Sequence, residues 1–259
     1  MVLLDSLITQ VQVIWALLIR ETRTRFGTNR LGYLWAFVEP LVTITIFFAA
    51  YFLTGTTSMG QMGLFPYLAT GIIPYFFFSS VSGRISVAIT SNTNLLYYPH
   101  VTTVDVIISR YLLELATYLV IFAAFLGGYG LATDELTMDS MLATLSGIVL
   151  AGVLGMGWGT LECAARTISD SAEMFFGFLG RPLFWVSGLF FTANDLTSDI
   201  RDVLLYNPLL HVTEIVRDGW FNQYTAFYVD LSYVLKWCLG MLVVGFSLER
   251  LTRRRIQVT

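Results

Sequence analysis

Lysine is almost absent from this sequence: Lys236 is the only one among 259 residues, and it lies in an apolar segment. A phosphate-binding loop of the form G-x-x-x-x-G-K-[ST] requires a lysine directly after a glycine-rich turn. The chain contains no such loop. We therefore expect that it does not bind and hydrolyse ATP by that route.

Histidine and cysteine are also scarce. His100 and His211 are far apart in the sequence, and neither has metal-ligand spacing or an acid and a nucleophile nearby. Cys163 and Cys238 lie in apolar segments, which predicts small buried hydrophobic residues rather than a disulfide framework. No serine has a G-x-S-x-G context. The sequence thus predicts no catalytic centre and no metal site.

Charge is low throughout. Charged residues make up 13% of the chain and hydrophobic residues 56%, whereas an average soluble domain is about a quarter charged. The mean hydropathy is +0.69, and several apolar runs have the roughly 20 residues that a helix needs to cross a bilayer. The sequence therefore predicts an integral membrane protein. A net charge of -3 gives no basis for nucleic-acid binding.

Six of these runs predict six transmembrane helices in an all-α membrane protein with a single domain over residues 1–259. The fourth run contains Gly155 and Gly159 in a G-x-x-x-G pattern, which lets helix backbones approach closely. The spacing of Arg110 with Glu114, and of Glu162 with Arg166, predicts pairing on one helix face. The predicted spans cover about 33–53, 65–89, 106–131, 141–165, 174–191 and 231–248.

Two further segments have helical patterns but lack either the length or the apolar composition of a span. Residues 3–25 have apolar positions at helical spacing with polar residues between them, which favours an amphipathic helix in the membrane interface. A short first span is the competing interpretation. Between the fifth and sixth spans, two apolar patches separated by Asn207 and Pro208 predict re-entrant half-helices. An ordinary extracytoplasmic helical hairpin is the alternative there.

Arginines set the predicted orientation. Four of them precede the first span, and four more lie in the tail of residues 249–259. Because basic residues flanking spans stay in the cytoplasm, both termini are predicted to be cytoplasmic. The first four arginines are Arg20, Arg23, Arg25 and Arg30.

Four stretches resemble the inner-membrane permeases of capsular polysaccharide ABC exporters, the Kps/Bex/Ctr group of type-2 ABC transporters. They are R-T-R-F-G-x-x-R-L-G-Y-L-W-A-F-V-E-P at residues 23–40, G-I-I-P-Y-F-F-F at 71–78, N-L-L-Y-Y-P-H-V at 94–101 and N-P-L-L-H-V-T-E-I-V-R-D-G-W at 207–220. The resemblance covers essentially the whole chain. Lipopolysaccharide O-antigen permeases share much of this pattern.

The resemblance implies a homodimer in the bacterial inner membrane, with each subunit docked on a separate ATPase subunit that holds ATP and Mg. It also implies a periplasmic co-polymerase, an outer-membrane export protein and a lipid-linked anionic polysaccharide as substrate. The chain itself is then a transport subunit without enzyme activity or a cofactor. The coupling surface would lie at 94–101, with Asn94, Tyr97, Tyr98, Pro99 and His100.

Two more groups of residues are candidates for contact with the substrate. The residues proposed for the cytoplasmic entrance are the four arginines and three residues at the start of the first span. They are Arg20, Arg23, Arg25, Arg30, Tyr33, Trp35 and Glu39. Candidates for the channel or its gate are Trp158, Trp185, Asn207 and Pro208. A teichoic-type glycan permease, a small-molecule efflux permease, and a membrane-embedded enzyme or scaffold remain competing hypotheses.

Overall fold

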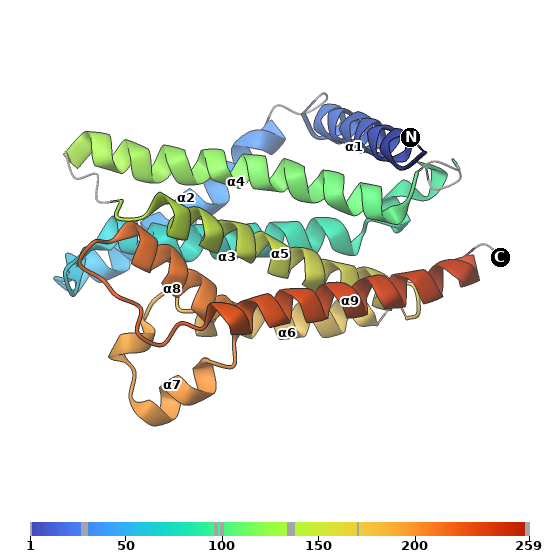
Figure 1. Cartoon of the computed structure of the whole chain (residues 1–259). Coiled ribbons are helices and arrows are strands. Elements are labelled where there is room, and N and C mark those ends of the chain that lie inside the picture. The colour runs from blue at the N-terminus through green and yellow to red at the C-terminus, as the bar shows by residue number, and fades with distance from the viewer. Residues whose placement is uncertain are drawn as a thin grey trace.

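The computed structural model describes residues 2–26, 31–95, 98, 101–133, 138–169 and 171–256. Nearly all regular structure within these ranges is helical (Figure 1), which confirms the all-α prediction. The α-helices are α1 (Val2–Phe26), α2 (Leu31–Leu53), α3 (Leu64–Ser86), α4 (Thr103–Thr133), α5 (Met141–Arg166), α6 (Ala172–Val186), α7 (Ser198–Leu204), α8 (Pro208–Trp220) and α9 (Leu231–Ile256). The 3-10 helices are η1 (Thr90–Leu95) and η2 (Ala193–Asp195).

A small hairpin joins α2 to α3. Strand β1 (Ser58–Met59) pairs antiparallel with β2 (Met62–Gly63). The turn contains Gly60 with a φ of +60°, a conformation that glycine adopts without steric cost. The connection between the first two long apolar helices is therefore a hairpin that runs directly into α3.

Five helices in the described part of the chain are long and apolar enough to cross a membrane. They correspond to the first, second, third, fourth and sixth predicted spans. The predicted fifth span differs, because α6 ends at Val186 after 15 residues rather than continuing to Phe191. The chain turns at Gly188, whose φ is +75°. Helix α6 is thus shorter than the roughly 20 residues of an ordinary span.

The core is centred on α3, which is the most buried of the five long apolar helices. It packs against α2, α4, α5 and α8. A Cβ on Gly155 would lie 2.6 Å from the Phe78 carbonyl oxygen, and one on Gly159 would lie 2.6 Å from the Ser82 carbonyl oxygen. The G-x-x-x-G pattern therefore brings the backbones of α3 and α5 together, as its spacing predicts. Both cysteines are free and buried, as expected.

The long helices run in roughly one direction, which gives the molecule two distinct ends (Figure 1). Both chain termini lie at one end, where α1 rests on the first part of α4. Helix α7 lies toward the other end. Its neighbour α8 is almost wholly buried and packs on α3 and α5. Protein atoms therefore cover α8, as the re-entrant prediction requires.

Candidate functional site

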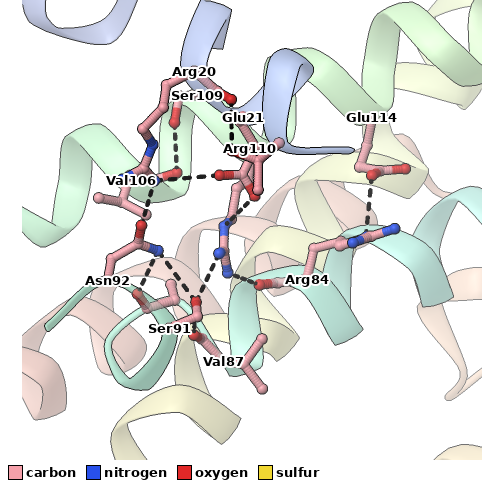
Figure 2. Close-up of polar contacts among 12 residues, drawn as sticks. Arg20, Glu21, Arg84, Val87, Ser91, Asn92, Val106, Ser109, Arg110 and Glu114 are labelled. Carbon is pink, nitrogen blue, oxygen red and sulfur yellow. Dashed lines mark hydrogen bonds and ion pairs between the residues drawn. The ribbon is translucent and has the colours of Figure 1, made fainter. Parts of the chain in front are cut away.

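Charged side chains from α1, α3 and α4 meet in a cluster that we call the polar junction (Figure 2). Arg110 on α4 forms an ion pair with Glu21 on α1, with 3.2 Å between Nε and Oε1. Arg84 on α3 pairs with Glu114 on α4, with 3.5 Å between Nε and Oε1. These ion pairs join separate helices, so the expected pairing of Arg110 with Glu114 along α4 is wrong. The tertiary packing offers each of them an oppositely charged partner on another helix.

The polar junction also reaches η1, the 3-10 turn between α3 and α4. The Arg110 guanidinium donates to the Ser91 hydroxyl at 2.7 Å and to the carbonyl oxygen of Arg84. Arg20 donates to the side-chain oxygen of Asn92, which is itself buried. Helix α1 is therefore hydrogen-bonded to the turn that precedes the stretch predicted to contact an ATPase.

A second contact fixes α1 nearer its N-terminus. Asp105 in the first turn of α4 is fully buried, and its Oδ2 accepts hydrogen bonds at 2.8 Å from both the amide and the hydroxyl of Thr102. This reciprocal arrangement caps the start of α4. The other Asp105 oxygen accepts a hydrogen bond from the Gln10 side chain of α1. The two contacts together hold α1 against the beginning of α4.

A fully buried ion pair lies in α8, where Arg217 and Glu214 approach to 3.3 Å. The Arg217 guanidinium also donates to the carbonyl oxygens of Phe191 at 2.9 Å and Leu189 at 3.2 Å. Its carbon Cζ lies 4.1 Å from the centre of the Tyr67 ring on α3. Arg217 thus connects α8, α3 and the segment that follows α6. A buried charge needs several such partners to offset its desolvation.

The start of α8 is tied to the end of α6. The Asn207 side-chain nitrogen donates to the Val186 carbonyl at 3.1 Å and to the Ser187 hydroxyl at 2.9 Å. Its oxygen accepts from the Leu209 amide at 3.0 Å, which caps α8. Pro208 occupies the first helical turn, where its missing amide hydrogen costs nothing.

His211 links the segments on either side of α8. One ring nitrogen accepts from the Asp230 amide at 3.1 Å, and the other lies 2.9 Å from the Leu205 carbonyl oxygen. Both contacts are satisfied only by the neutral imidazole, and burial lowers the pKa of His211 accordingly. The pKa of Asp230 is lowered because the Ser232 hydroxyl and the Tyr233 amide donate to its carboxylate. Asp230 thereby caps the start of α9.

An apolar cavity of about 350 Å³ lies among α3, α5, α6, α7, α8 and α9. Three predicted channel or gate residues, Trp158, Asn207 and Pro208, line this apolar cavity. Trp185 is exposed and lies instead against Phe47, with ring centres 6.2 Å apart. The structure thus brings together three of the four.

A second cavity of about 360 Å³ lies between α6 and the α3–α5 pair, and we call it the polar cavity. Its charged lining includes Arg166, which forms the predicted ion pair with Glu162 at 2.7 Å. Phe78 and Trp158 border both this cavity and the apolar one. The two cavities are therefore neighbours along α5.

Comparison with known proteins identifies the family. The profile of the family described as ABC-2 type transporter matches residues 12–221. The chain belongs to this family. It is 31% identical over 244 residues, 94% of each chain, to a protein named polysialic acid transport protein KpsM from Escherichia coli. It is 28% identical over 246 residues to the capsule polysaccharide export inner-membrane protein BexB of Haemophilus influenzae, covering 95% of this chain and 93% of that one.

A more distant relative is the O-antigen export system permease protein RfbA of Klebsiella pneumoniae. It is 21% identical over 239 residues, 88% of this chain and 87% of the relative. As a member of the ABC-2 type transporter family with five long apolar helices, the chain is a multi-pass membrane protein of an ABC exporter. Such membership implies an ATPase partner.

The predicted coupling surface of this ABC-2 transporter chain is described in part. Tyr98 is 63% exposed and available to a partner. The side chain of Asn94, together with Tyr97, Pro99 and His100, lies outside the described residues. The assignment of these residues to an ATPase contact stays a prediction.

The predicted entrance residues divide into two groups. Arg20 is engaged by Asn92 and Glu21, whereas Arg23, Trp35 and Glu39 are exposed. The side chains of Arg25, Arg30 and Tyr33 lie outside the described residues. The entrance role therefore also stays a prediction.

Sequence reasoning missed the buried pair of Glu214 and Arg217. Their i, i+3 spacing on a short helix with an apolar face was a usable signal. It also missed the contact between Glu21 and Arg110, which are 89 positions apart and carry no local pattern.

Proposed function

We propose that this chain is the transmembrane permease subunit of an ATP-driven exporter that moves lipid-linked capsular polysaccharide across the bacterial inner membrane. The observation that carries this proposal is similarity over 94% of both chains to a polysialic acid transport protein. Similarity of nearly the same extent to a capsule polysaccharide export inner-membrane protein supports it. Because both similarities run through almost the entire chain, they include every helix that surrounds the cavities.

Export of an O-antigen-type glycan is a second candidate. It is favoured by the similarity to RfbA, which also extends over most of the chain. The identity there is 21%, against 31% for the polysialic acid transport protein. We therefore place capsular polysaccharide first.

The working assembly in this proposal is a homodimer of six-span subunits, each a single domain over residues 1–259. A separate ATPase subunit supplies ATP and Mg, and a periplasmic co-polymerase and an outer-membrane export protein complete the path. Both termini face the cytoplasm, in agreement with the arginines near each end of the chain. Both chain termini lie on the same side of the molecule (Figure 1), which supports this orientation.

Within this assembly, α1 and the 94–101 stretch form the surface that receives the ATPase stroke. The hydrogen bonds from α1 to Asn92 and Asp105 support that role, because they attach α1 to the chain on both sides of this stretch. The exposed Arg23 side chain is suited to an anionic group at the entrance, since a guanidinium binds phosphate or carboxylate with two parallel hydrogen bonds. Asn207 and Pro208 lie where α6 meets α8 and form part of the gate.

Deletion of the gene in its own host, followed by complementation, tests the proposal. We expect surface polysaccharide to disappear and lipid-linked polysaccharide to accumulate inside the cell, with both effects reversed by the intact chain. Analysis of the accumulated glycan separates a capsular polymer from an O-antigen. Normal surface glycan in the deletion strain, with no internal accumulation, would contradict both candidates.

A further inference from the structure

The apolar and polar cavities are neighbours beside α6, and we call the two together the α6 cleft. They share Phe78 and Trp158, whose rings lie 6.2 Å apart. On α5 the lining residues Leu154, Trp158, Glu162 and Arg166 recur every fourth position, so they lie on one helix face. The 12 residues from the first to the last of them correspond to about 18 Å. This α6 cleft is thus apolar at one end and charged at the other.

Helix α6 covers the cleft without filling it. None of the residues of α6, all of which the structure describes, is buried. Gly177 and Gly180 face the polar cavity, and a Cβ at either would have no atom within 4 Å. The Tyr75 hydroxyl of α3 donates to the Gly180 carbonyl at 3.2 Å and holds α6 in position. The space beside these glycines is therefore open to a ligand.

The polar cavity is lined by two arginines and two glutamates, and both glutamates pair with the same arginine. Arg166 is neutralised by Glu162 at 2.7 Å and Glu173 at 3.0 Å. Arg181 lines the same cavity but has no ion pair or hydrogen bond with any residue in the described ranges. A guanidinium among apolar helices is costly unless it meets an anion. Its planar fork matches a phosphate group particularly well.

The position of Arg181 separates the two kinds of surface. The next α6 residues that line the cleft are Leu183 and Val186, in the apolar cavity. In the other direction the polar cavity presents the hydroxyls of Ser79 and Ser82. An amphiphile with a phosphate between a hydrocarbon chain and a small hydroxylated head would match this sequence of surfaces.

We propose that the α6 cleft binds an anionic glycerophospholipid of the surrounding membrane. The phosphate binds Arg181, one acyl chain occupies the apolar cavity, and the hydroxylated head lies against Ser79 and Ser82. This proposal depends on the membrane location of the chain and not on the identity of the exported polymer. A bound lipid would supply the packing that α6 lacks on its inner face.

Lipid retention by the full-length chain in detergent tests the proposal. Native mass spectrometry would follow the protein after incubation with equal amounts of phosphatidylglycerol and phosphatidylcholine. We expect a preference for phosphatidylglycerol, and Arg181→Gln should lower its retention about tenfold, because it removes a charge-assisted contact. Gly177→Leu should lower retention of both lipids, since the leucine would fill the open space.

Two variants provide matched controls. Arg250→Gln removes the same charge from an exposed site on α9, and Gly128→Leu adds the same side chain to an open site on α4. Both should retain lipid as the wild type does. Equal retention of the two lipids by the wild type, or unchanged phosphatidylglycerol retention in Arg181→Gln, would overturn the proposal. The second result is also the one expected if a protein surface rather than a lipid covers α6. If Gly177→Leu does not fold, the comparison of Arg181→Gln with Arg250→Gln decides alone.

Discussion

At the scale of single residues, ion pairs determine how the helices are joined. Arg217 has no exposed surface and depends on Glu214, two carbonyl oxygens and the face of Tyr67. Removing one member of a buried pair leaves the other charge without compensation, which costs far more than loss of an exposed pair. An ion pair between arginine and a carboxylate is therefore critical for stability in α8 but contributes little on the surface.

We predict that Arg217→Met lowers the free energy of unfolding by about 3–5 kcal/mol. The loss reflects the Glu214 carboxylate, which would remain buried without its cation. Thermal unfolding of the detergent-purified chain measures the effect.

The matched control for Arg217→Met is Asp202→Asn. It breaks an ion pair with Arg201 in which the aspartate side chain is 73% exposed. That change should cost at most about 1 kcal/mol. Adding Glu214→Gln to Arg217→Met should recover part of the loss, and a strictly additive double variant would argue against coupling of the two charges.

Individual pairings show what the sequence can and cannot predict at this scale. Glu162 and Arg166 pair as their spacing predicts, and Arg166 also pairs with Glu173 on α6. Arg110 has the same spacing to Glu114 but pairs with Glu21. Spacing along one helix determines which side-chain contacts are possible, whereas the packing of neighbouring helices determines which of them forms.

At the scale of elements, small residues and cross-helix hydrogen bonds set the distances between helices. Gly155 and Gly159 allow α5 to approach the backbone of α3, and the polar junction holds α1 on α4 and η1. The first feature was visible in the sequence as a spacing of four. The second joins residues that are distant in the chain.

Gly159→Ala is predicted to destabilise the chain by about 1–3 kcal/mol. The added Cβ would lie 2.6 Å from the Ser82 carbonyl oxygen, so the backbones of α3 and α5 would have to separate. Gly127→Ala on α4 is the control, because its Cβ would meet nothing within 4 Å. It should be neutral or slightly stabilising, since alanine favours helix more than glycine does. Equal melting temperatures for the two variants would contradict this account of the α3–α5 contact.

The polar junction yields a prediction about coupling. Glu21→Gln should lower export severalfold without lowering the amount of protein. The reason is that α1 would lose its ion pair to Arg110, so that a movement of η1 would be transmitted to α1 less fully. Surface polysaccharide at matched expression is the measurement. Asp199→Asn, an exposed carboxylate on α7, is the control and should export normally.

Exchanging the two charges tests whether the ion pair between Glu21 and Arg110, rather than either charge alone, is needed for export. Arg110→Glu alone should impair export strongly, and combining it with Glu21→Arg should restore part of the activity. If the combined variant is worse than either single one, the ion pair is not what connects α1 to α4.

At the scale of the whole molecule, hydropathy predicts most of the architecture. Five of the six predicted spans are long apolar helices. The fifth was predicted to continue to Phe191 because residues 187–191 are as apolar as those before them. Composition does not reveal that Gly188 adopts a positive φ or that Asn207 holds the end of α6. The cavities could not be predicted either, since they depend on how far apart the helices stand.

Topology makes a prediction that covers the whole chain. A cysteine at Tyr98, in a background with Cys163→Ala and Cys238→Ala, should react with a membrane-impermeant thiol reagent only from the cytoplasmic side. It should also crosslink to the ATPase subunit, because Tyr98 is exposed on the predicted coupling surface. A cysteine at Tyr206, which is exposed near α8, should react only from the periplasm. Labelling of both positions from one side would contradict the proposed orientation.

The shortness of α6 has a consequence for the lipid around it. As the fifth span of the proposed topology, its 15 residues extend about 22 Å, whereas the hydrocarbon layer of a bilayer is about 30 Å thick. Such a mismatch is relieved by local thinning of the bilayer or by tilting of neighbouring helices. The membrane beside α6 should therefore be indented where Arg181 faces the cleft. A thinner membrane shortens the distance over which a polar molecule must be shielded, so α6 would mark the side on which such a molecule enters the protein most easily.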